Sequence, residues 1–508
     1  MSGDGQARLI AWLRTPAAHG GRGPVEHIET HISHVFLAGD RALKLKKAIR
    51  PAFLDYSTVG KRQAAALAEL AINRRTAPAL YLDVVPVRAD ATGFHLGGGR
   101  GRIVDWLVRM RSFDQADLLD RMARERRLEA THVAALADAV AQLHAVAERR
   151  SDQGGTAGMH WHFTVPLEAL EGMESCPFSE AALKRMRGRL EAEWRRLAPL
   201  LEARRRHGFV RHGHGDLHLG NACLFRGKVT LFDAVEFSDR IACVDILYDA
   251  AFMVMDLVAH GRRDFATLFL SRYLEATRDY GGLGAMPFFI AIRALVRAMA
   301  NALSRTASGE AHARRYFALA EQALERPPVP QLVAVGGLSG TGKSRLARAL
   351  LVHLPALPGA VHIRSDGIRK RLFGRCPEER LPASAYSRDW HRRTYDRLHR
   401  DVRRALAAGW PAVADATFID VNSRARIAAL ADHLGVPFAG LWLEAPADIL
   451  RARIRGRGPD ASDADLAVLE AQLARDVGPL DWTRIDAGEA PERVASRALD
   501  AIGVGERP

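Results

Sequence analysis

The stretch "QLVAVGGLSGTGKSRLARAL", Gln331 to Leu350, decides the fold of the C-terminal third of this chain. It begins as a short apolar run, passes through a glycine loop, and continues with the apolar spacing of an amphipathic helix. Gly337, Gly342, Lys343 and Ser344 match the pattern G-x-x-x-x-G-K-[ST] in full. A strand, a glycine loop and a helix in this order predict a phosphate-binding loop, because N–H groups at a helix N-terminus face phosphate oxygens.

The loop predicts the residues that bind ATP and Mg²⁺. Lys343 is expected to reach the β and γ phosphates, and the hydroxyl of Ser344 is expected to bind Mg²⁺. The expected nucleotide-binding residues of the loop are Gly337, Ser339, Gly340, Thr341, Gly342, Lys343 and Ser344.

An acidic residue suited to activating an acceptor follows in "AVHIRSDGIRKRLFG". Asp366 lies where a predicted strand gives way to a helix, and we expect it to be the base for an acceptor hydroxyl, with Arg369 as an anion clamp. The alternative is that Asp366, or Ser365 before it, only caps the helix.

Two more segments complete the predicted C-terminal site. Asp415 ends the buried strand in "PAVADATF" and is expected to join the Mg²⁺ site. Arg453 and Arg457, in "LRARIRGRGPD", are expected to close over the phosphates.

The boundary of this region is the Pro-rich stretch "ALERPPVPQ", Ala323 to Gln331, which ends a helix and stiffens a connector. The length of 508 residues predicts about three folding units. We expect an α+β part over 1–325, β-rich over 25–105 and helical over 106–325. A linker at 326–330 then leads to an α/β domain over 331–508, where alternating strands and helices predict a parallel sheet.

A second group of candidate catalytic and metal-binding residues lies in "HGDLHLGN", His214 to Asn221. Phosphoryl transfer to a hydroxyl needs a carboxylate near the attacking oxygen and oxygen ligands for Mg²⁺. Asp216 is suited to accept the hydroxyl proton and Asn221 to bind the metal. The following "ACLF", "RGK" and "VTLFD" predict a β-hairpin whose return strand brings Asp233 beside Asn221 as a second metal ligand.

The same stretch has another interpretation. His212, His214 and His218 would form a zinc site, while the Asp and Asn residues cap turns. Neither Cys nor Glu stands nearby at the spacing of a metalloenzyme, which favours the phosphotransfer interpretation. His214 and His218 are then expected to brace the loop by hydrogen bonds.

A buried ion pair is predicted upstream. In "HISHVFLAGDRALKLKK" two strands are joined by the turn Gly39-Asp40, and Ala42 and Lys44 share a face of the second strand. On the next predicted helix, Glu69 has mostly apolar neighbours one turn away, so its carboxylate needs a cation. Lys44 is the expected partner, and Lys46 is the reserve.

"HGDLHLGN" followed by "LFD" resembles the catalytic and metal-binding loops of the aminoglycoside phosphotransferase and choline kinase family, a branch of the protein-kinase-like fold. The resemblance covers about residues 25 to 320. It implies that Asp216 is the catalytic base, that Asn221 and Asp233 bind Mg²⁺, and that Lys44 pairs with Glu69. It also implies that "VDWLVRM", Val104 to Met110, is the hinge against adenine.

The C-terminal part, about residues 329 to 500, resembles small P-loop kinases such as gluconate kinase, chloramphenicol phosphotransferase, polynucleotide kinase and the zeta-toxin group. This two-domain order resembles bacterial proteins described as bifunctional aminoglycoside phosphotransferase/ATP-binding proteins. It implies two kinase sites, each moving the γ-phosphoryl group of ATP to the hydroxyl of a small molecule. The alternatives are a P-loop module that only regulates, and a kinase that acts on nucleic-acid ends.

The composition of the chain indicates which classes of binding partner to expect. A net charge of +14 would suit nucleic acid, but the basic residues are spread along the chain, which favours a solvated basic surface. Segment 166–208, which helps to build the acceptor site in the first family, has more basic than acidic residues, so a neutral or anionic acceptor is expected. Apolar runs are broken by Arg, and the four cysteines have no CxxC spacing. We therefore expect a cytoplasmic protein with no membrane contact and with reduced, buried thiols.

A glycine-containing segment, "SDQGGTAGMHWHF" from Ser151 to Phe163, is predicted to be a loop.

Overall fold

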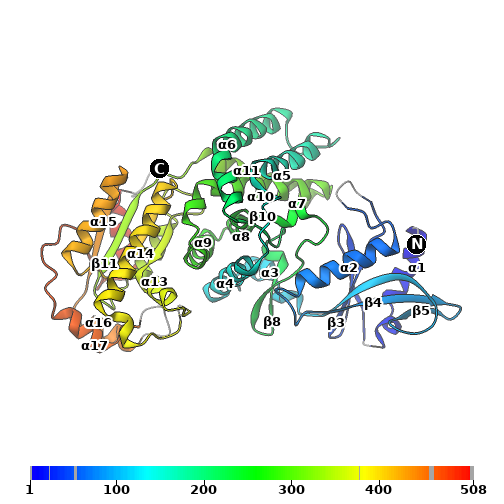
Figure 1. The fold of residues 1–508 in the computed structure, drawn as a ribbon, viewed down its shortest axis with the longest axis horizontal. Helices are drawn as coiled ribbons and strands as arrows, with labels where there is room; N and C mark the ends of the chain where they lie inside the picture. Colours follow the sequence, from blue (N-terminus) through cyan, green and yellow to red (C-terminus); the bar gives the residue numbers. More distant parts are fainter. Residues whose placement is uncertain (1–2, 22, 51–53, 377, 457–462, 504–508) are drawn as a thin grey trace. The chain divides into compact units, whose positions relative to one another are not determined.

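The computed structural model describes residues 3–21, 23–50, 54–376, 378–456 and 463–503 (Figure 1). By packing, the chain forms two compact units, one from 1–159 with 201–253 and one from 160–200 with 254–508. The sequence predicts a different boundary, at the Pro-rich stretch 326–330, because the kind of fold changes there. This domain boundary stays a prediction.

The first unit is built around a six-stranded antiparallel sheet with the strand order β1-β2-β3-β6-β4-β5. Its strands are β1 (Glu26–Glu29), β2 (Ser33–Ala38), β3 (Arg41–Lys46), β4 (Tyr81–Asp90), β5 (Gly93–Leu96) and β6 (Arg102–Arg111). The predicted hairpin joins β2 to β3 through Gly39 and Asp40, and Gly39 has the positive φ of 57° that a type II′ turn requires.

Two helices cover the two faces of this sheet: α1 (Gly3–Leu13) and α2 (Val59–Asn73). Leu43 and Leu45 of β3 pack in the core that includes α1 residues, whereas Ala42 lies in the core that includes Ala66 of α2. Because side chains alternate along a strand, Lys44 shares the α2 face with Ala42. Figure 1 shows α2 lying along the sheet above β3 and β4.

Short elements follow the sheet and carry the predicted catalytic loop. The helices here are η2 (Gln115–Asp117), α3 (Leu119–Arg124), α4 (Ala130–Val146), η3 (Leu219–Asn221), α7 (Asp239–Ala242) and α8 (Ile246–Ala259), with η1 (Pro16–His19) lying earlier in the chain. Two antiparallel strand pairs accompany them: β7 (Val210–His212) with β10 (Cys243–Asp245), and β8 (Ala222–Phe225) with β9 (Lys228–Leu231). The second pair is the hairpin expected after Asn221.

Long helices dominate the middle of the chain, as the periodicity predicts. They are α5 (Gly155–Glu171), α6 (Glu180–Arg206), α9 (Arg263–Thr277), α10 (Met286–Leu303) and α11 (Ala307–Glu325), with the short 3-10 helix η4 (Tyr280–Ala285) directly before α10. The prediction of a loop over 151–163 is wrong, because α5 begins at Gly155. Met159, Phe163 and Leu167 are buried at a spacing of four residues, and this packing outweighs the low helix propensity of the glycines.

One helical stretch, Tyr280–Leu303, is the only part of the described chain that is long and apolar enough to cross a membrane. Buried residues make up 67% of its most apolar window, which is also typical of a core helix. Two of the four free cysteines, Cys223 and Cys243, are buried as expected, whereas Cys376 is exposed and Cys176 is partly exposed. The expectation of buried thiols is therefore wrong for those two.

The C-terminal region is a five-stranded sheet of parallel strands with the order β12-β13-β11-β14-β15, which confirms the predicted α/β fold. The strands are β11 (Leu332–Gly337), β12 (Val361–Arg364), β13 (Ala412–Asp415), β14 (Phe438–Glu444) and β15 (Thr483–Asp486). All six residues of β11 are buried, which is typical of a central parallel strand.

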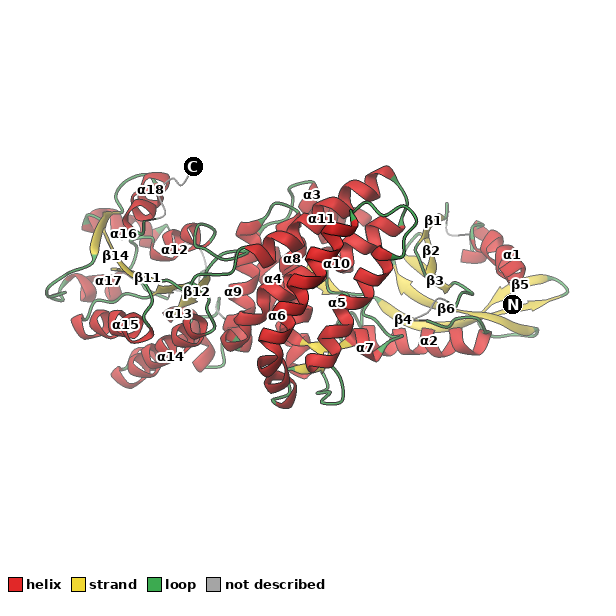
Figure 2. Ribbon diagram, turned by 90° about the horizontal axis from the view of Figure 1, so that it is seen from above, coloured by secondary structure: helices red, strands yellow, loops and turns green. Residues whose placement is uncertain are grey.

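Helices lie on both faces of this sheet: α12 (Lys343–Leu351), α13 (Ser365–Leu372), η5 (Ala383–Tyr386), α14 (Arg388–Ala407), α15 (Val421–Leu434), α16 (Ala447–Arg455), α17 (Leu466–Leu473) and α18 (Pro491–Ala501). Figure 2 shows α12 and α18 on one face and α14 and α15 on the other. The face that α12 and α18 cover holds a continuous apolar core. The carboxyl ends of β11, β12 and β13 therefore meet at one edge, where ligands bind in such sheets.

Candidate functional site

The catalytic loop brings Asp216 and Asn221 into direct contact. The Asn221 side-chain nitrogen donates to the Asp216 backbone oxygen at 2.9 Å and to its carboxylate at 3.0 Å. Because the nitrogen of this amide faces Asp216, its oxygen is the atom suited to a metal ion. The Asp216 side chain is 44% exposed, so an acceptor hydroxyl can approach it from solvent.

The hairpin β8–β9 brings Asp233 beside this pair, as its pattern predicts. The N–H of Phe232 donates to the backbone oxygen of Asn221 at 3.0 Å, and Asp233 follows directly. Asp233 has a φ of 62°, an uncommon conformation for a residue other than glycine. Its carboxylate lies 2.5 Å from the Lys44 ammonium.

Lys44, on β3, pairs with Glu69, on α2, at 2.7 Å. Lys46, two residues further along the same strand face, binds the other oxygen of Glu69 at 2.5 Å. Lys44, the expected partner, and Lys46, the alternative partner, therefore both bind the Glu69 carboxylate. Burial disfavours the charged form of Lys44, but the carboxylates of Asp233 and Glu69 hold the Lys44 pKa well above its usual value.

The same cations control Glu69, whose side chain is fully buried. Burial alone would raise the pKa of Glu69, but Lys44 and Lys46 lower it to about 2. The pair is therefore ionised across the physiological pH range.

A third carboxylate, Glu236, extends this network and was not predicted from the sequence. Its Oε1 binds the Lys46 ammonium and accepts a hydrogen bond from the Tyr56 hydroxyl at 2.7 Å. Glu236 lies three residues after Asp233, and no local pattern marks its partners, which are about 180 residues away in the sequence. We call Lys44, Lys46, Glu69, Asp233 and Glu236 the lysine–carboxylate network.

Asp249, at the start of α8, is another residue that sequence reasoning missed. Its fully buried carboxylate accepts from the backbone N–H groups of His214 at 2.8 Å and Gly215 at 3.1 Å. A Cβ on Gly213 would lie 2.5 Å from this carboxylate, so only glycine allows the approach. Asp249 therefore fixes the backbone just before Asp216.

The histidines of the loop brace it, as expected. The Nε2 atom of His214 lies 3.0 Å from the Phe232 backbone oxygen, and the Nδ1 atom of His218 accepts from the N–H of Gly220 at 3.0 Å. Within the described part of the chain, no group of three or more His, Cys, Asp or Glu side chains is placed to hold a metal ion. These contacts give no support to the zinc interpretation.

The expected adenine hinge, Val104–Met110, lies inside strand β6, which pairs with β3 on one side and with β4 on the other. Its backbone groups are therefore used within the sheet. The chain leaves the sheet only after Arg111, so the segment that is free to face a base starts later than predicted.

In the C-terminal site, the phosphate-binding loop has the predicted position between β11 and α12. The Ser344 hydroxyl donates to the Asp415 carboxylate at 2.6 Å, which unites two of the expected Mg²⁺ residues. Gly337 has a φ of 137°, and a Cβ there would lie 2.6 Å from the Leu443 backbone oxygen. Lys343 donates to the Leu338 backbone oxygen at 2.8 Å.

Asp415 is held by an imidazole and a guanidinium from the neighbouring strand β12. The His362 imidazole lies 3.1 Å and the Arg364 guanidinium 3.6 Å from its Oδ2 atom. Burial would raise the pKa of Asp415, but the hydrogen bond from His362 and the charges of His362 and Arg364 hold it below its usual range.

Asp366 lies in the first turn of α13, partly exposed at the edge where the strands end. Burial raises its pKa, although Arg364 opposes the rise. The capping alternative is not supported, because the N-cap of α13 is Arg364, whose side chain makes no capping hydrogen bond. Arg369, one turn later, donates to the Ala385 backbone oxygen at 2.8 Å and lies over the Tyr386 ring.

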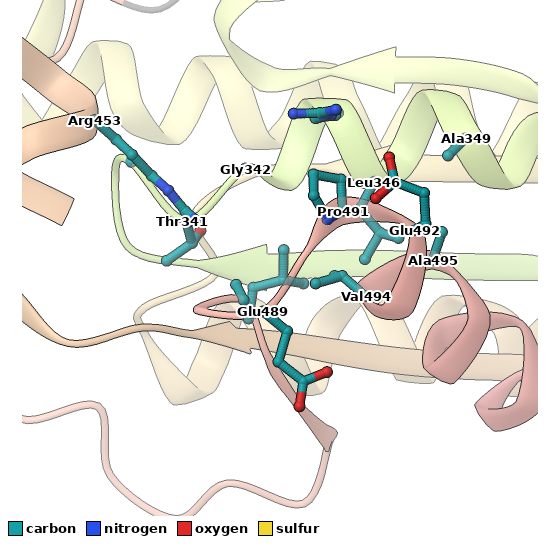
Figure 3. Close-up of a pocket in the computed structure, with 14 residues that line it drawn as sticks. Thr341, Gly342, Leu346, Ala349, Arg453, Glu489, Pro491, Glu492, Val494 and Ala495 are labelled. Carbon is teal, nitrogen blue, oxygen red and sulfur yellow. The ribbon is translucent and has the colours of Figure 1, made fainter. Parts of the chain in front are cut away.

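A cavity of about 610 Å³ borders the phosphate-binding loop. Its walls come from the loop and α12, from α16, and from α18 with the segment that precedes it. Figure 3 shows the Arg453 side chain extending toward Thr341 and Gly342, with Pro491 and Val494 lining the opposite side. Arg457, the second expected lid arginine, lies outside the described residues.

One contact within the loop was not predicted. The backbone N–H of Ser339 donates to the side-chain oxygen of Gln472, on α17, at 2.8 Å. The side-chain oxygen of Gln472 therefore binds a backbone N–H group that a phosphate oxygen could otherwise bind.

Comparisons with known proteins found one matching family model and several similar proteins. A family model described as an AAA domain matches residues 332–479. The adenylyl-sulfate kinase of Myxococcus xanthus is 28% identical over 169 residues, which cover 33% of this chain and 83% of that enzyme. The crystal structure of a choline/ethanolamine kinase family protein from Mesorhizobium loti has a TM-score of 0.39 and 16% identity, and it covers 64% of this chain and 95% of its own.

The predicted class of enzyme, a kinase, is confirmed at this level by the C-terminal part of the chain, to which the adenylyl-sulfate kinase is similar. An uncharacterized protein of Mycobacterium tuberculosis is 31% identical over 486 residues, which cover 92% of this chain and 94% of that protein. This chain therefore belongs to the family of that mycobacterial protein, with which it aligns over most of its length.

Proposed function

We propose that the protein is a cytoplasmic, ATP- and Mg²⁺-dependent phosphotransferase with two nucleotide sites. Each site transfers the γ-phosphoryl group of ATP to a hydroxyl of a small molecule. The proposal divides the chain into a phosphotransferase domain over 1–325 and a P-loop kinase domain over 331–508, joined by the Pro-rich linker.

The meeting of the lysine–carboxylate network with the catalytic loop supports the N-terminal site most strongly. Lys44 supplies a cation for ATP phosphates, and Asp233 and Asn221 offer the hard oxygen ligands that Mg²⁺ prefers. When bound, Mg²⁺ neutralises charge on the phosphates. Asp216, held by Asn221 and open to solvent, accepts the proton of the attacking hydroxyl.

The C-terminal site has the same chemical parts on another scaffold. The loop from Gly337 to Ser344 presents its backbone N–H groups to phosphates, and Ser344 with Asp415 would hold Mg²⁺. The raised pKa of Asp366 makes its carboxylate a stronger proton acceptor than an ordinary aspartate. The cavity beside Arg453 has room for the rest of the nucleotide.

The acceptor of the N-terminal site is proposed to be neutral or anionic. Segment 166–208, which helps to build the acceptor site in the family that this part resembles, has nine basic and seven acidic residues. A polycationic acceptor would be repelled by such a surface.

A metabolite-library screen tests the function. The full-length protein is incubated with ATP, Mg²⁺ and the library, and mass spectrometry detects any compound that gains one phosphate. Asp216→Asn is expected to lower one activity about 10²- to 10⁴-fold and Asp366→Asn the other, because each removes one proton acceptor. The two-site proposal is wrong if both substitutions suppress the same product and leave every other product unchanged.

One observation favours a second candidate function for the P-loop domain, which is regulatory ATP binding without turnover. Gln472 occupies the Ser339 N–H, and Lys343 bonds its own loop, so the loop is closed by groups of the chain itself. Under this alternative, Lys343→Ala abolishes nucleotide binding at the loop, and Asp366→Asn leaves every product unchanged.

A further inference from the structure

Helix α9 precedes the P-loop domain in the sequence by more than fifty residues, yet it packs on the sheet of that domain. It lies beside β12, an edge strand whose outward N–H groups have no neighbouring strand (Figure 2). The N–H of His362 donates instead to the Ser271 hydroxyl of α9 at 3.0 Å, and both residues are buried. A helix of the middle region therefore completes the edge of the sheet.

The residue held in this way leads directly to the magnesium residues. The His362 imidazole contacts the Asp415 carboxylate at 3.1 Å, and the same oxygen accepts from the Ser344 hydroxyl at 2.6 Å. A continuous series of contacts thus runs from α9 through β12 and β13 to the first turn of α12. A shift of β12 would displace His362 and, with it, the carboxylate that orients Ser344.

A second contact joins α9 to the helix that carries Asp366. The Glu275 carboxylate lies so close to Gly367 that a Cβ there would meet it at 2.6 Å, and the same carboxylate accepts from Arg371 at 3.0 Å. Glycine within a helix costs about 1 kcal/mol relative to alanine. An alanine at this position, directly after Asp366, would therefore displace the Glu275 carboxylate.

We propose that α9 helps to position the residues of the P-loop site, and that Ser271 and Glu275 are its positioning residues. Through His362 they hold Asp415 and Ser344 in place for Mg²⁺, and through Gly367 they set the position of Asp366. Binding of ATP with Mg²⁺ is consequently linked to the packing of α9, and this helix joins the P-loop site to the middle region of the chain. The inference rests on the proposed nucleotide site at the P-loop.

Calorimetric titration of the full chain with ATP, with and without Mg²⁺, tests the inference. The relevant signal is the part of the binding that Lys343→Ala removes. Ser271→Ala is expected to weaken it about tenfold when Mg²⁺ is present and to leave Mg²⁺-free binding unchanged, since about 1.4 kcal/mol corresponds to a factor of ten. Ser271→Thr, which keeps the hydroxyl, should restore the affinity, and Gly367→Ala should reproduce the loss.

The matched control is Arg263→Ala, also on α9. Arg263 donates to the Pro358 backbone oxygen at 3.0 and 2.9 Å, so it contacts the P-loop domain away from the magnesium residues. We expect the effect of Mg²⁺ on ATP affinity to be the same in Arg263→Ala as in the wild type. A tenfold loss in this control as well would overturn the specific roles of Ser271 and Glu275.

Hydrogen exchange on the wild type needs no substitution. Adding ATP with Mg²⁺ should slow the exchange of the His362 amide and of α9, whereas ATP alone should not.

The calorimetric titrations separate two kinds of failure. If Lys343→Ala binds ATP as the wild type does, the proposed nucleotide site is wrong, and the inference falls with it. If Lys343→Ala loses binding while Ser271→Ala and Gly367→Ala retain it in full, only the role of α9 is wrong.

Discussion

The two candidate sites hold similar chemical groups by different means. In the N-terminal site, the lysine–carboxylate network joins residues from β3, α2 and the segment after β9, and its contacting pairs are up to 190 residues apart in the sequence. In the C-terminal site, eight consecutive residues form most of the phosphate-binding loop. The first site depends on charges that neutralise one another in the interior, whereas the second depends on backbone N–H groups. Substitutions should therefore damage the first through stability and the second through ligand binding.

The largest effect is expected from Glu69→Ala. This change leaves Lys44 and Lys46 buried without their shared carboxylate, which should cost about 3–5 kcal/mol, as for other buried pairs that lose one partner. Hydrogen exchange of the β3 amides measures the loss. Glu29→Ala is the matched control, because Glu29 pairs with Lys47 at the surface, where loss of an ion pair has little effect on stability. Equal losses in the two variants would show that the network does not stabilise the first unit.

Acid should weaken the same network. The pKa of Glu69 falls from 4.5 to about 2 on folding, so the folded state binds fewer protons. Its contribution to stability is complete above about pH 4.5 and is lost as the pH falls toward 2. The difference in unfolding free energy between the wild type and Glu69→Gln, measured against pH, should shrink over this window. A difference that stays constant from pH 6 to 2 would contradict the ionised state of Glu69.

Lys343→Ala should affect ligand binding and leave the free protein almost unchanged. ATP with Mg²⁺ at one hundred times its dissociation constant should stabilise the wild type by about 2.7 kcal/mol, and the variant should lose this gain. Hydrogen exchange of the β11 amides with and without nucleotide measures it. Lys61→Ala, which removes an exposed lysine of the first unit, serves as control and should keep the full gain.

The smallest effect is expected from Gln472→Ala. Nucleotide phosphates must compete with Gln472 for the Ser339 N–H, so its removal should strengthen ATP binding by about 1 kcal/mol, roughly fivefold. Glu470→Gln, on the same helix but paired with Arg451 at the surface, should leave the affinity unchanged. Weaker binding by Gln472→Ala would instead make Gln472 a ligand of the bound state.

Hairpins and the phosphate-binding loop were predicted correctly, because their signals are local. Gly39-Asp40 and the turn after Phe225 specify hairpins through residues that tolerate positive φ, and the second hairpin carries Asp233 back beside Asn221. The helix over 155–163 was missed, because its stability comes from the burial of Met159 and Phe163 and not from its glycine-rich sequence. The hinge was placed too early, because an apolar run does not show where a strand leaves its sheet.

From the sequence alone one can predict the position of the glycine loop Gly337–Ser344, the candidate catalytic stretch with Asp216 and Asn221, and the pairing of Lys44 with Glu69. Each follows from short spacing or from the need of a buried charge for a partner. Only the tertiary structure decided that Lys46 and Glu236 join that pair, that Asp249 holds the catalytic loop, and that Ser271 of α9 reaches β12. These contacts link segments far apart in the chain, and their energies depend on distances that only packing sets.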